Sequence, residues 1–376
     1  MRITAIETKA LRIPFKAPFH WAQGVAEAAE VILVCVHTDS GVTGYGESMG
    51  APALRSTQIL LEEAGRLCVG RSLYDINEML RQAYQHIFVA RNCSSPRFGG
   101  LVLAGLDMAL WDAAGKACGR AVHELLGGAV RDHIQYFGFP QGDTAEQLAL
   151  EARQWADRGC DVIYAKIGRD PKLDLEIAAR IRTAIGDRRL RLDANEAWDV
   201  LTAQRMIRSL AAFNVEFIEQ PTSSNSLAAL RQVKATSSIP IAADQLVFTP
   251  EEVYAVCEQR AADLIVLGLH EAGGFDRFRK AAAIAEVAGL NVCLHGLYET
   301  GITTCASNQV GATLLNLDDG NQYMNHFLAE DIVGSPELTL RNGKLPVLSG
   351  PGLGFELNWD AVHRAEEAYR AYAGKR

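Results

Sequence analysis

Three acidic residues recur at nearly equal intervals in the middle of this 376-residue chain, and each closes an apolar run. Asp193, Glu219 and Asp244 follow one another at intervals of about 25 residues, which is the length that one strand, one loop and one crossover helix need. A parallel barrel built from such units gathers the C-terminal ends of its strands around one mouth. The interval therefore predicts three carboxylates that are distant in sequence and adjacent in space.

Converging carboxylates repel one another unless a cation lies between them. Carboxylate oxygens are the ligands preferred by Mg²⁺ and Mn²⁺, whereas zinc prefers nitrogen and sulfur. We therefore predict that Asp193, Glu219 and Asp244 bind Mg²⁺, with Mn²⁺ as the alternative ion.

Nearly the same interval continues in both directions along the chain. Lys166 precedes Asp193 by one such interval, Gly268 follows Asp244 by another, and His295 follows Gly268 by a third. A strand often ends in a polar residue simply because a loop begins there. The nearly constant interval between these strand ends nevertheless favours a functional cluster over a simple transition from strand to loop.

From residue 134 onward, apolar strand-like runs alternate with segments of helical periodicity. The predicted strands are 134–138, 161–167, 189–193, 215–219, 239–243, 262–267 and 291–295. The predicted helices are 144–158, 173–185, 200–210, 226–236, 250–259 and 275–288. This alternation predicts an α/β fold with a parallel sheet closed into a modified TIM (β/α) barrel. An eighth strand is not defined by the pattern.

The two ends of the chain follow other patterns. Residues 1–50 predict antiparallel strands with a loop over 14–27, and residues 55–120 have helical spacing. The glycines at 41, 44 and 46 are assigned to a turn and to strand packing, because no helix follows them as in a phosphate-binding loop. Near the C-terminus we predict a hairpin over 338–347 and a helix over 360–372.

The composition limits the partners and the compartment. A net charge of −8 argues against binding to nucleic acid. None of the eight cysteines forms a Cys-x-x-Cys pair, so reduced thiols are expected. The N-terminus lacks a signal-peptide core, and no membrane-spanning helix is expected. These features predict a cytoplasmic protein.

Several short motifs occur in an order that resembles one known family. They are Leu-Asp-Met-Ala-Leu-Trp-Asp at 106–112, Leu-Leu-Gly-Gly at 125–128, Lys-Ile-Gly at 166–168, Asp-Ala-Asn at 193–195, Glu-Gln-Pro at 219–221 and Gly-Pro-Gly-Leu-Gly at 350–354. Over its whole length the chain resembles the enolase superfamily, in the mandelate racemase and muconate lactonizing enzyme branch. Glu-Gln-Pro favours the muconate lactonizing side.

The resemblance implies three parts: an N-terminal α+β capping domain (1–128), the barrel (129–335) and a C-terminal segment that returns to the cap (336–376). It also implies that Mg²⁺ binds the carboxylate of a small-molecule substrate. The ion would stabilise the enediolate formed when the α-proton leaves. A homo-oligomer, from dimer to octamer, and no membrane partner are expected.

Three departures from the family pattern shape the predicted mechanism. Tyr164 replaces the outer Lys of the second strand, and Gly268 stands where the lactonizing branch carries a Lys and the racemase branch an Asp. His295 therefore lacks its expected acidic partner. We predict that Lys166 abstracts the α-proton and that His295 is the acid on the other face. Tyr164 is predicted to orient Lys166 or to hydrogen-bond the metal-bound carboxylate.

One base and one acid suit β-elimination or cycloisomerisation of a small hydroxy, sugar or amino acid. Racemisation or epimerisation by Lys166 and His295 ranks slightly lower, because the second base is weakened. A vestigial metal-binding homologue without turnover is the remaining alternative. A nicotinamide-dependent reductase would not need three carboxylates.

The other candidate residues flank these positions. Asn195 and Gln245 are predicted to support the metal ligands, and His270 and Glu271 are the alternative source of the missing sixth-strand group. The predicted substrate contacts are His20, Trp21, Tyr298 and Glu299.

Overall fold

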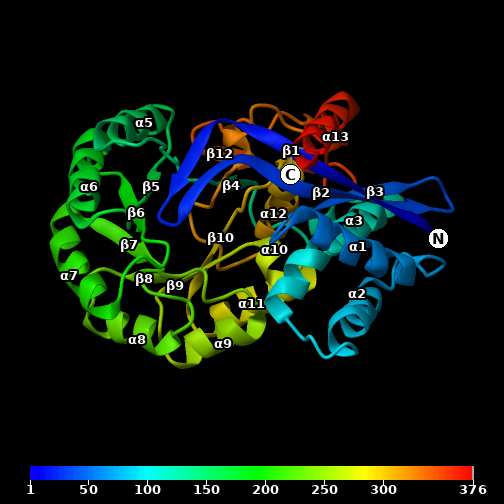
Figure 1. Cartoon of the computed structure of the whole chain (residues 1–376), viewed down its shortest axis with the longest axis horizontal. Coiled ribbons are helices and arrows are strands. Elements are labelled where there is room, and N and C mark those ends of the chain that lie inside the picture. The colour runs from blue at the N-terminus through cyan, green and yellow to red at the C-terminus, as the bar shows by residue number, and fades with distance from the viewer. Residues whose placement is uncertain (375–376) are drawn as a thin grey trace.

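The computed structural model describes residues 1–374, and Figure 1 shows an antiparallel sheet with helices beside a ring of parallel strands. The antiparallel sheet has the order β1-β2-β3. Its strands are β1 (Ile3–Trp21), β2 (Gly24–Thr38) and β3 (Thr43–Met49). The helices that follow are α1 (Leu54–Cys68), α2 (Ile76–Tyr84) with a π-helical turn (Gln85–Val89), α3 (Pro96–Cys118) and α4 (Val122–Leu125).

The strand β3 packs directly on α3 because two of its residues are glycines. A Cβ atom on Gly46 would lie 2.2 Å from the carbonyl oxygen of Gly105 and 2.6 Å from the amide nitrogen of Ala109. Gly44 meets Ala109 and Ala113 in the same way. The predicted packing role of these glycines is therefore confirmed.

Helix α3 is long and apolar enough to cross a membrane, judged by length and composition alone. However, 83% of its most apolar window is buried inside the protein. Its residues pack against β2, β3 and α10, as expected for the central helix of a globular domain.

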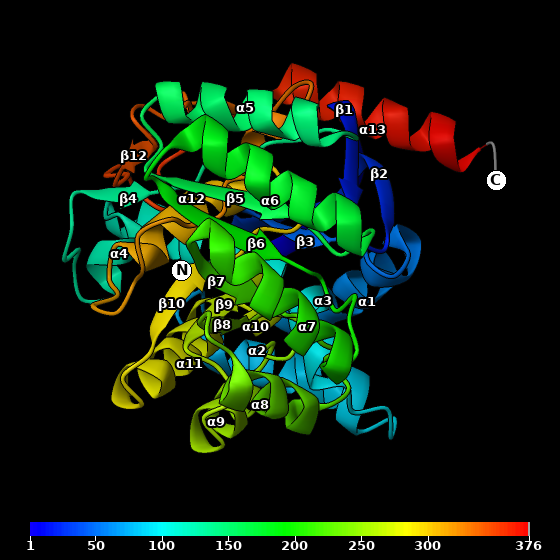
Figure 2. The same ribbon diagram turned by 90° about the vertical axis from the view of Figure 1, so that its left-hand side faces the viewer.

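Six parallel strands form the larger sheet in the order β10-β9-β8-β7-β6-β5. They are β5 (Val162–Lys166), β6 (Arg189–Asp193), β7 (Val215–Glu219), β8 (Ile241–Ala243), β9 (Leu264–Leu267) and β10 (Asn291–Leu294). The helices are α5 (Ala145–Asp157), α6 (Pro171–Ile185), α7 (Val200–Leu210), α8 (Leu227–Thr236), α9 (Pro250–Glu258), α10 (Leu269–Ala272), α11 (Phe275–Val287) and α12 (Gly301–Gly311). Figure 2 shows α5, α6 and α7 on the outer side of this sheet.

Short parallel bridges close the sheet into a ring. Gly138 pairs with Ile163 on β5, Tyr136 pairs with Asn321, and Leu317 pairs with Val292 on β10. The segment around 317–322 therefore fills the eighth position, which the sequence pattern did not define. The predicted α/β fold with a modified barrel is confirmed.

One predicted feature of the chain ends is wrong, and another is confirmed only in part. The expected loop over 14–27 is the outer part of a long β1–β2 hairpin, in which Trp21 pairs with Gly24. The prolines in this stretch obscured the strand, because the register shifts between Pro14 and Phe19. The expected hairpin over 338–347 is present only as one antiparallel bridge between Arg341 and Lys344. Its second arm, β12 (Lys344–Pro346), otherwise pairs with β4 (His133–Gln135).

The C-terminal segment ends in α13 (Trp359–Ala373), which packs on β1 of the antiparallel sheet. Before it, β11 (Val333–Ser335) pairs with β13 (Glu356–Leu357).

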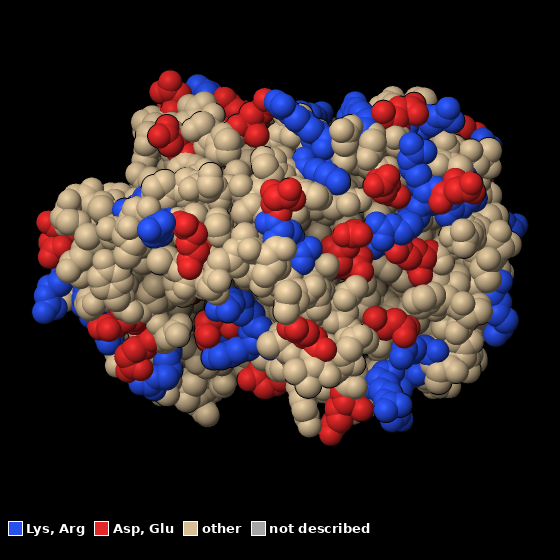
Figure 3. All heavy atoms as spheres, turned by 180° about the vertical axis from the view of Figure 1, so that it is seen from behind, with Lys and Arg blue, Asp and Glu red and all other residues tan. Residues whose placement is uncertain are grey.

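Figure 3 shows basic and acidic side chains interspersed on the face opposite to that of Figure 1. Mixed signs on that face give no concentrated positive field.

Replacement of Gly46 by alanine should destabilise the protein by about 3 kcal/mol, since the new methyl group overlaps the backbone of α3. Urea unfolding at neutral pH measures the change. Gly24→Ala is the matched control, because its Cβ would meet only Trp21 Nε1 at 3.6 Å. Equal stability of the two variants would contradict the packing argument.

Candidate active site

The strand ends of the barrel bring Lys166, Asp193 and Glu219 to the same level. Lys166 on β5 pairs in register with Asp193 on β6, and Asp193 pairs with Glu219 on β7. Asp244 follows β8 directly. The side chains of Asp193, Glu219 and Asp244 are 0%, 1% and 0% exposed. Residues that recur at a nearly constant interval in the sequence thus form one cluster at the barrel mouth.

Tyr164 links two of these carboxylates. Its hydroxyl lies 2.6 Å from Asp193 Oδ2 and 2.9 Å from Glu219 Oε1, so its single proton is donated to one of them at a time. Lys166 Nζ forms an ion pair with the same Asp193 oxygen and lies 3.4 Å from the Tyr164 hydroxyl. One carboxylate oxygen is therefore shared by a lysine and a phenol.

Burial and mutual repulsion shift the pKa values of the acids. Burial is the main cause that raises the pKa of Asp244 to about 7; His295 opposes the rise, and the charges of Glu271 and Asp193 add to it. Burial also raises the pKa of Glu219 well above its ordinary value, together with the charges of Asp193 and Asp244. The ionised forms are costly in this arrangement, as expected for carboxylates that share one site.

The neighbouring acids raise the pKa values of the two basic groups. Burial lowers the pKa of Lys166, but Asp193 and Glu219 outweigh it, so the pKa lies above its ordinary value. Burial likewise lowers the pKa of His295, whereas Asp244 and Glu271 raise it to about 10. Both groups carry a proton at neutral pH while the carboxylates are their main electrostatic neighbours.

The donor set fits a hard divalent cation. Neither carboxylate oxygen of Asp244 accepts a hydrogen bond among residues 1–374, although the side chain is fully buried. Buried unpaired carboxylates are unfavourable unless a cation compensates them. Ligand atoms of Glu219, Asp244 and His295 lie within 4.8 Å of one another. Asp193 lies outside that group, and its Oδ2 is held by Lys166 and Tyr164.

His295 has an acidic partner, contrary to the prediction that it lacks one. The partner is Glu271, one of the two residues offered as the alternative. The Nδ1 atom of His295 lies 2.9 Å from Glu271 Oε1 and 3.5 Å from Asp244 Oδ1. Glu271 belongs to α10, the single turn that follows β9, and its Oε2 accepts a 2.7 Å hydrogen bond from the Gly268 amide. A Cβ atom on Gly268 would lie 3.1 Å from Glu271 Oε2 and 2.9 Å from the His295 carbonyl oxygen. Glycine at this strand end makes room for Glu271.

His270 was predicted together with Glu271 as a source of the missing sixth-strand group, but its side chain contacts other residues. Its Nε2 lies 2.9 Å from the carbonyl oxygen of Glu47 and 3.1 Å from Thr303 Oγ1. The side chain is 1% exposed, and burial lowers its pKa to about 4. Glu271 alone therefore reaches His295.

The end of the β1–β2 hairpin lies over the barrel mouth (Figure 1). Gln23 Nε2 donates a 3.1 Å hydrogen bond to the carbonyl oxygen of Asn195. The Trp21 ring packs edge-on against Tyr298, with centroids 6.4 Å apart, and Phe19 packs 5.6 Å from the same ring. His20 instead pairs with Asp143, 3.2 Å away. The sequence pointed to Trp21 and Tyr298 but not to Gln23.

The remaining predicted residues fall into two groups. Asn195 and Gln245 each keep a buried side-chain oxygen that has no hydrogen-bond partner among the described residues. The Asn195 amide donates a 2.7 Å hydrogen bond to Asp193 Oδ1.

Glu299 is 4% exposed, and its Oε2 accepts a 3.1 Å bond from the Leu297 amide. Burial raises the pKa of Glu299 well above its ordinary value, and Glu47 adds to the rise.

Gln220 was not singled out from the sequence, yet its side chain connects the ends of β7 and β8. Its Oε1 accepts a 3.0 Å hydrogen bond from the Asp244 amide, and its Nε2 donates to the Thr222 carbonyl oxygen at 2.8 Å. Its backbone φ of 33° lies in the left-handed region. The Glu-Gln-Pro motif was the available signal for this role.

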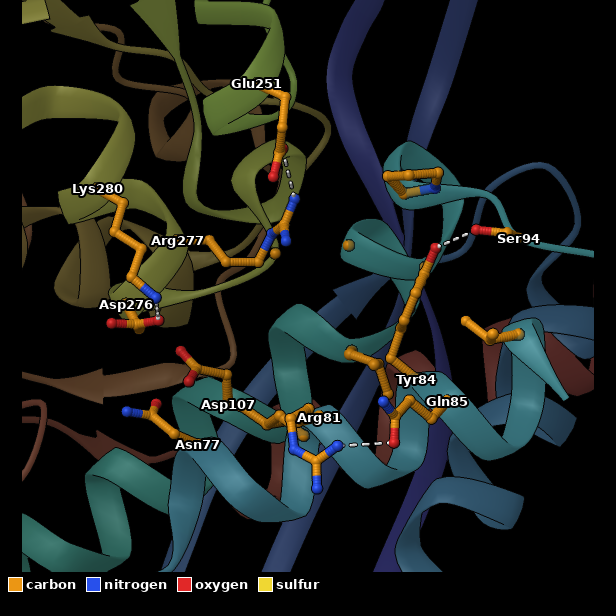
Figure 4. A pocket seen from close by; sticks show the side chains of 17 residues that line it. Asn77, Arg81, Tyr84, Gln85, Ser94, Asp107, Glu251, Asp276, Arg277 and Lys280 are labelled. Carbon is orange, nitrogen blue, oxygen red and sulfur yellow. Dashed lines mark hydrogen bonds and ion pairs between the residues drawn. The ribbon is translucent and has the colours of Figure 1, made fainter. Parts of the chain in front are cut away.

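A depression of about 600 Å³ lies away from this cluster, between α2, α3, α9 and α11 (Figure 4). Its labelled side chains include Tyr84, Asp107 and Arg277. None of the predicted site residues lines it. The barrel mouth is therefore the place where the chemically capable groups converge.

Comparison with known families agrees with this geometry. The model described as "Enolase C-terminal domain-like" matches residues 147–361. The model described as "Mandelate racemase / muconate lactonizing enzyme, N-terminal domain" matches residues 4–127. The chain belongs to the mandelate racemase and muconate lactonizing enzyme branch of the enolase superfamily. It is an enzyme of that superfamily, and the predicted family is confirmed.

Individual relatives of this enolase-superfamily chain span its whole length. Muconate cycloisomerase 1 of Rhodococcus opacus is 31% identical, over 96% of this chain and 98% of the relative. The solved muconate lactonizing enzyme of Pseudomonas fluorescens, complexed with muconolactone, has a TM-score of 0.89 and 30% identity, covering 97% and 99% of the two chains. A dipeptide epimerase from Enterococcus faecalis V583, complexed with Mg and L-Leu-L-Tyr, has a TM-score of 0.87 and 25% identity, covering 95% and 100%.

Mg²⁺ should raise the unfolding temperature of the wild-type protein in a concentration-dependent way, because it binds only the folded carboxylate cluster. Asp244→Asn should weaken Mg²⁺ binding by about tenfold or more. The same variant should not be less stable than wild type without Mg²⁺, since it removes one of three repelling charges. Thermal unfolding and calorimetric titration measure both effects.

The control for that measurement is Asp276→Asn, which changes a half-buried carboxylate that pairs with Lys280. This control should bind Mg²⁺ as wild type does. Full Mg²⁺ affinity in Asp244→Asn would contradict the metal site.

Proposed function

We propose that this enzyme removes the α-proton of a small carboxylate substrate with the help of Mg²⁺, and that elimination or cycloisomerisation follows. The observation that carries the proposal is the placement of two proton-transfer groups on either side of the acids. Lys166 contacts Asp193, whereas His295 contacts Asp244 and Glu271. Lys166 is the proposed base, and His295 is the proposed acid on the opposite face.

The proposed ligands of the ion are Asp193, Glu219 and Asp244. A bound Mg²⁺ would supply a Lewis acid for the substrate carboxylate and a positive charge that favours the neutral amine of Lys166. Release of Lys166 from Asp193 Oδ2 would free both the base and a ligand oxygen. Mg²⁺ is preferred, and Mn²⁺ is proposed as a substitute.

The other side chains have supporting roles in this proposal. Tyr164 holds Asp193 and Glu219 at a fixed separation, because one hydroxyl contacts both. Asn195 and Gln245 offer unpaired buried oxygens beside two ligand positions. Trp21 and Tyr298 cover the mouth and exclude water. His20 and Glu299 are further substrate-binding candidates.

Epimerisation is the second candidate, and one observation favours it. The hydrogen bond between Glu271 and His295 supplies the carboxylate that orients an imidazole and increases its basicity. His295 can then act as a second base as well as an acid. Relatives with both kinds of activity, a muconate cycloisomerase and a dipeptide epimerase, are similar to this chain. A binding protein without turnover is disfavoured, since Lys166 and the His295–Glu271 pair are both present.

Three further assignments belong to the same proposal. The substrate is a small molecule, as in the muconolactone and dipeptide complexes of the relatives. The enzyme is proposed to be a cytoplasmic homo-oligomer. The division into a cap (1–128), a barrel (129–335) and a returning segment (336–376) is retained, supported by the packing of α13 on β1.

The test is a panel of carboxylic acids incubated with the enzyme and Mg²⁺ in D₂O. The panel contains cis,cis-muconate, acid sugars, hydroxy acids, N-acyl amino acids and dipeptides. Nuclear magnetic resonance reads α-deuteration, loss of water and inversion. Lys166→Ala should lower α-deuteration and turnover on the order of 10³-fold, because the base is lost.

His295→Asn separates the two candidate reactions. For elimination or cycloisomerisation, α-deuteration should persist while turnover falls on the order of 100-fold. For epimerisation, the wild-type product should carry deuterium at an inverted centre without loss of water, and His295→Asn should exchange the α-proton without inverting that centre. Lys280→Ala, an exposed lysine, is the control. Turnover of Lys166→Ala within tenfold of wild type would refute the base assignment.

A further inference from the structure

We propose that Glu47, in strand β3 of the N-terminal sheet, is a positioning residue for the His295–Glu271 pair. The inference rests on the proposed function for its catalytic consequence, but the geometry itself can be measured without a substrate. Among residues 1–374, the hydrogen bonds of Glu47 go to the segments that carry His295 and Glu271 rather than to those two side chains. Glu47 therefore fixes the two segments that carry the pair, without a hydrogen bond to either side chain of the pair.

The first link runs through the Glu47 side chain. The carboxylate is 0% exposed and accepts hydrogen bonds from the Thr300 amide at 3.0 Å, the Thr300 hydroxyl at 2.7 Å and the Thr303 amide at 3.0 Å. Thr300 is the N-cap of α12, the helix reached from His295 through a short loop. A carboxylate at a helix N-terminus is favoured by the free amides and the helix dipole. Glu47 therefore fixes the end of the loop that begins at His295.

The second link runs through the Glu47 main chain. Its carbonyl oxygen lies 2.9 Å from His270 Nε2. A carbonyl oxygen can only accept a hydrogen bond, so Nε2 carries the proton and Nδ1 is the bare nitrogen. Thr303 Oγ1 lies 3.1 Å from the same Nε2. His270 immediately precedes Glu271 in α10, so this bond fixes the helix that carries the carboxylate.

The helix α10 depends on such contacts because it is only four residues long. Glycines flank it: Gly268 precedes it, and Gly273 and Gly274 follow with φ values of 86° and 108°. On its other side it packs on α3, where a Cβ atom on Gly100 would lie 3.1 Å from the Glu271 carbonyl oxygen. A single turn bounded by glycines has little rigidity of its own. Its position is thus set by the N-terminal domain.

One residue of the cap therefore positions both members of a pair that is assembled from two different strand ends. The Glu271 Oε1 to His295 Nδ1 distance of 2.9 Å is sensitive to movement of either segment. This arrangement makes the orientation of His295 depend on docking of the cap. Loss of the Glu47 side chain should misplace His295 while leaving Lys166, on β5, in position.

Asp112 provides a matched control within the same domain. It is also 0% exposed, and it accepts 2.8 Å hydrogen bonds from the Tyr45 and Leu353 amides. These partners belong neither to α10 nor to the loop after His295. Asp112→Asn should therefore lower stability without changing the His295–Glu271 pair.

The test compares Glu47→Gln with Asp112→Asn in the full-length protein. Selective ¹⁵N-histidine labelling, with His295→Asn to assign the signal, reports the hydrogen-bonded Nδ1–H of His295. Glu47→Gln should lose or shift that signal, and hydrogen exchange of the amides in 268–272 should rise by about tenfold or more. Asp112→Asn should keep the wild-type signal and exchange rate. Identical spectra and exchange rates in wild type and Glu47→Gln would overturn the proposal.

Thr303→Val is the second variant, needed if Glu47→Gln does not fold. It removes the hydroxyl near His270 and keeps the side-chain shape, so the His295 signal should shift in the same direction. An unchanged signal would overturn the proposal.

Kinetics then test the catalytic consequence, with muconolactone and L-Ala-L-Glu, which both carry an α-proton, as probes in D₂O. Glu47→Gln should lower kcat about tenfold more than it lowers the rate of α-deuteration, with KM nearly unchanged. Equal losses of turnover and α-deuteration would overturn the positioning role. Absence of α-deuteration by the wild-type protein across the whole carboxylate panel would refute the proposed function instead, and the spectra would still decide the positioning.

Discussion

Electrostatic repulsion among buried carboxylates at the barrel mouth is the constraint on which the rest of this structure depends. Asp193, Glu219 and Asp244 are almost completely excluded from water, and the oxygens of Asp244 accept no hydrogen bond from the described residues. Such a cluster is unfavourable unless cations compensate it. Lys166 and a protonated His295 supply part of that compensation. A divalent ion would supply the rest and would release both groups for proton transfer.

The N-terminal domain completes the site from two directions. The end of the β1–β2 hairpin covers the mouth through Trp21 and Gln23. Strand β3 and helix α3 reach the side of the barrel, where Glu47 caps α12 and α3 packs on α10. The capping domain therefore acts both as a cover and as a brace. This explains why glycines at 44 and 46 are needed, since they let β3 lie close against α3.

Much of the barrel and of the carboxylate cluster could be predicted, because both follow from local periodicity. The strands at 189–193 and 215–219 and the helix at 200–210 have the predicted bounds. The nearly constant spacing of the strand ends also predicts which side chains meet at the barrel mouth, without knowledge of any tertiary contact. That prediction placed Lys166, Asp193 and Glu219 at one level, as the register shows.

The errors arose where non-local contacts decide the structure. Glu271 reaches His295 only because α10 folds a single turn back over Gly268, a geometry that strand phase does not encode. The β1–β2 hairpin continues past its prolines because Phe19 is buried against barrel residues such as Phe139 and Phe327. The pairing of β12 with β4 joins segments that lie far apart in the chain. None of these contacts has a signal in local sequence.

The most direct test of the central claim is a crystal structure of the protein grown with Mg²⁺, repeated with Mn²⁺ for its anomalous signal. The account predicts one divalent ion bound by Asp193, Glu219 and Asp244, with Lys166 no longer paired to Asp193. An ion bound elsewhere, or an intact Lys166–Asp193 pair beside an empty carboxylate cluster, would contradict it.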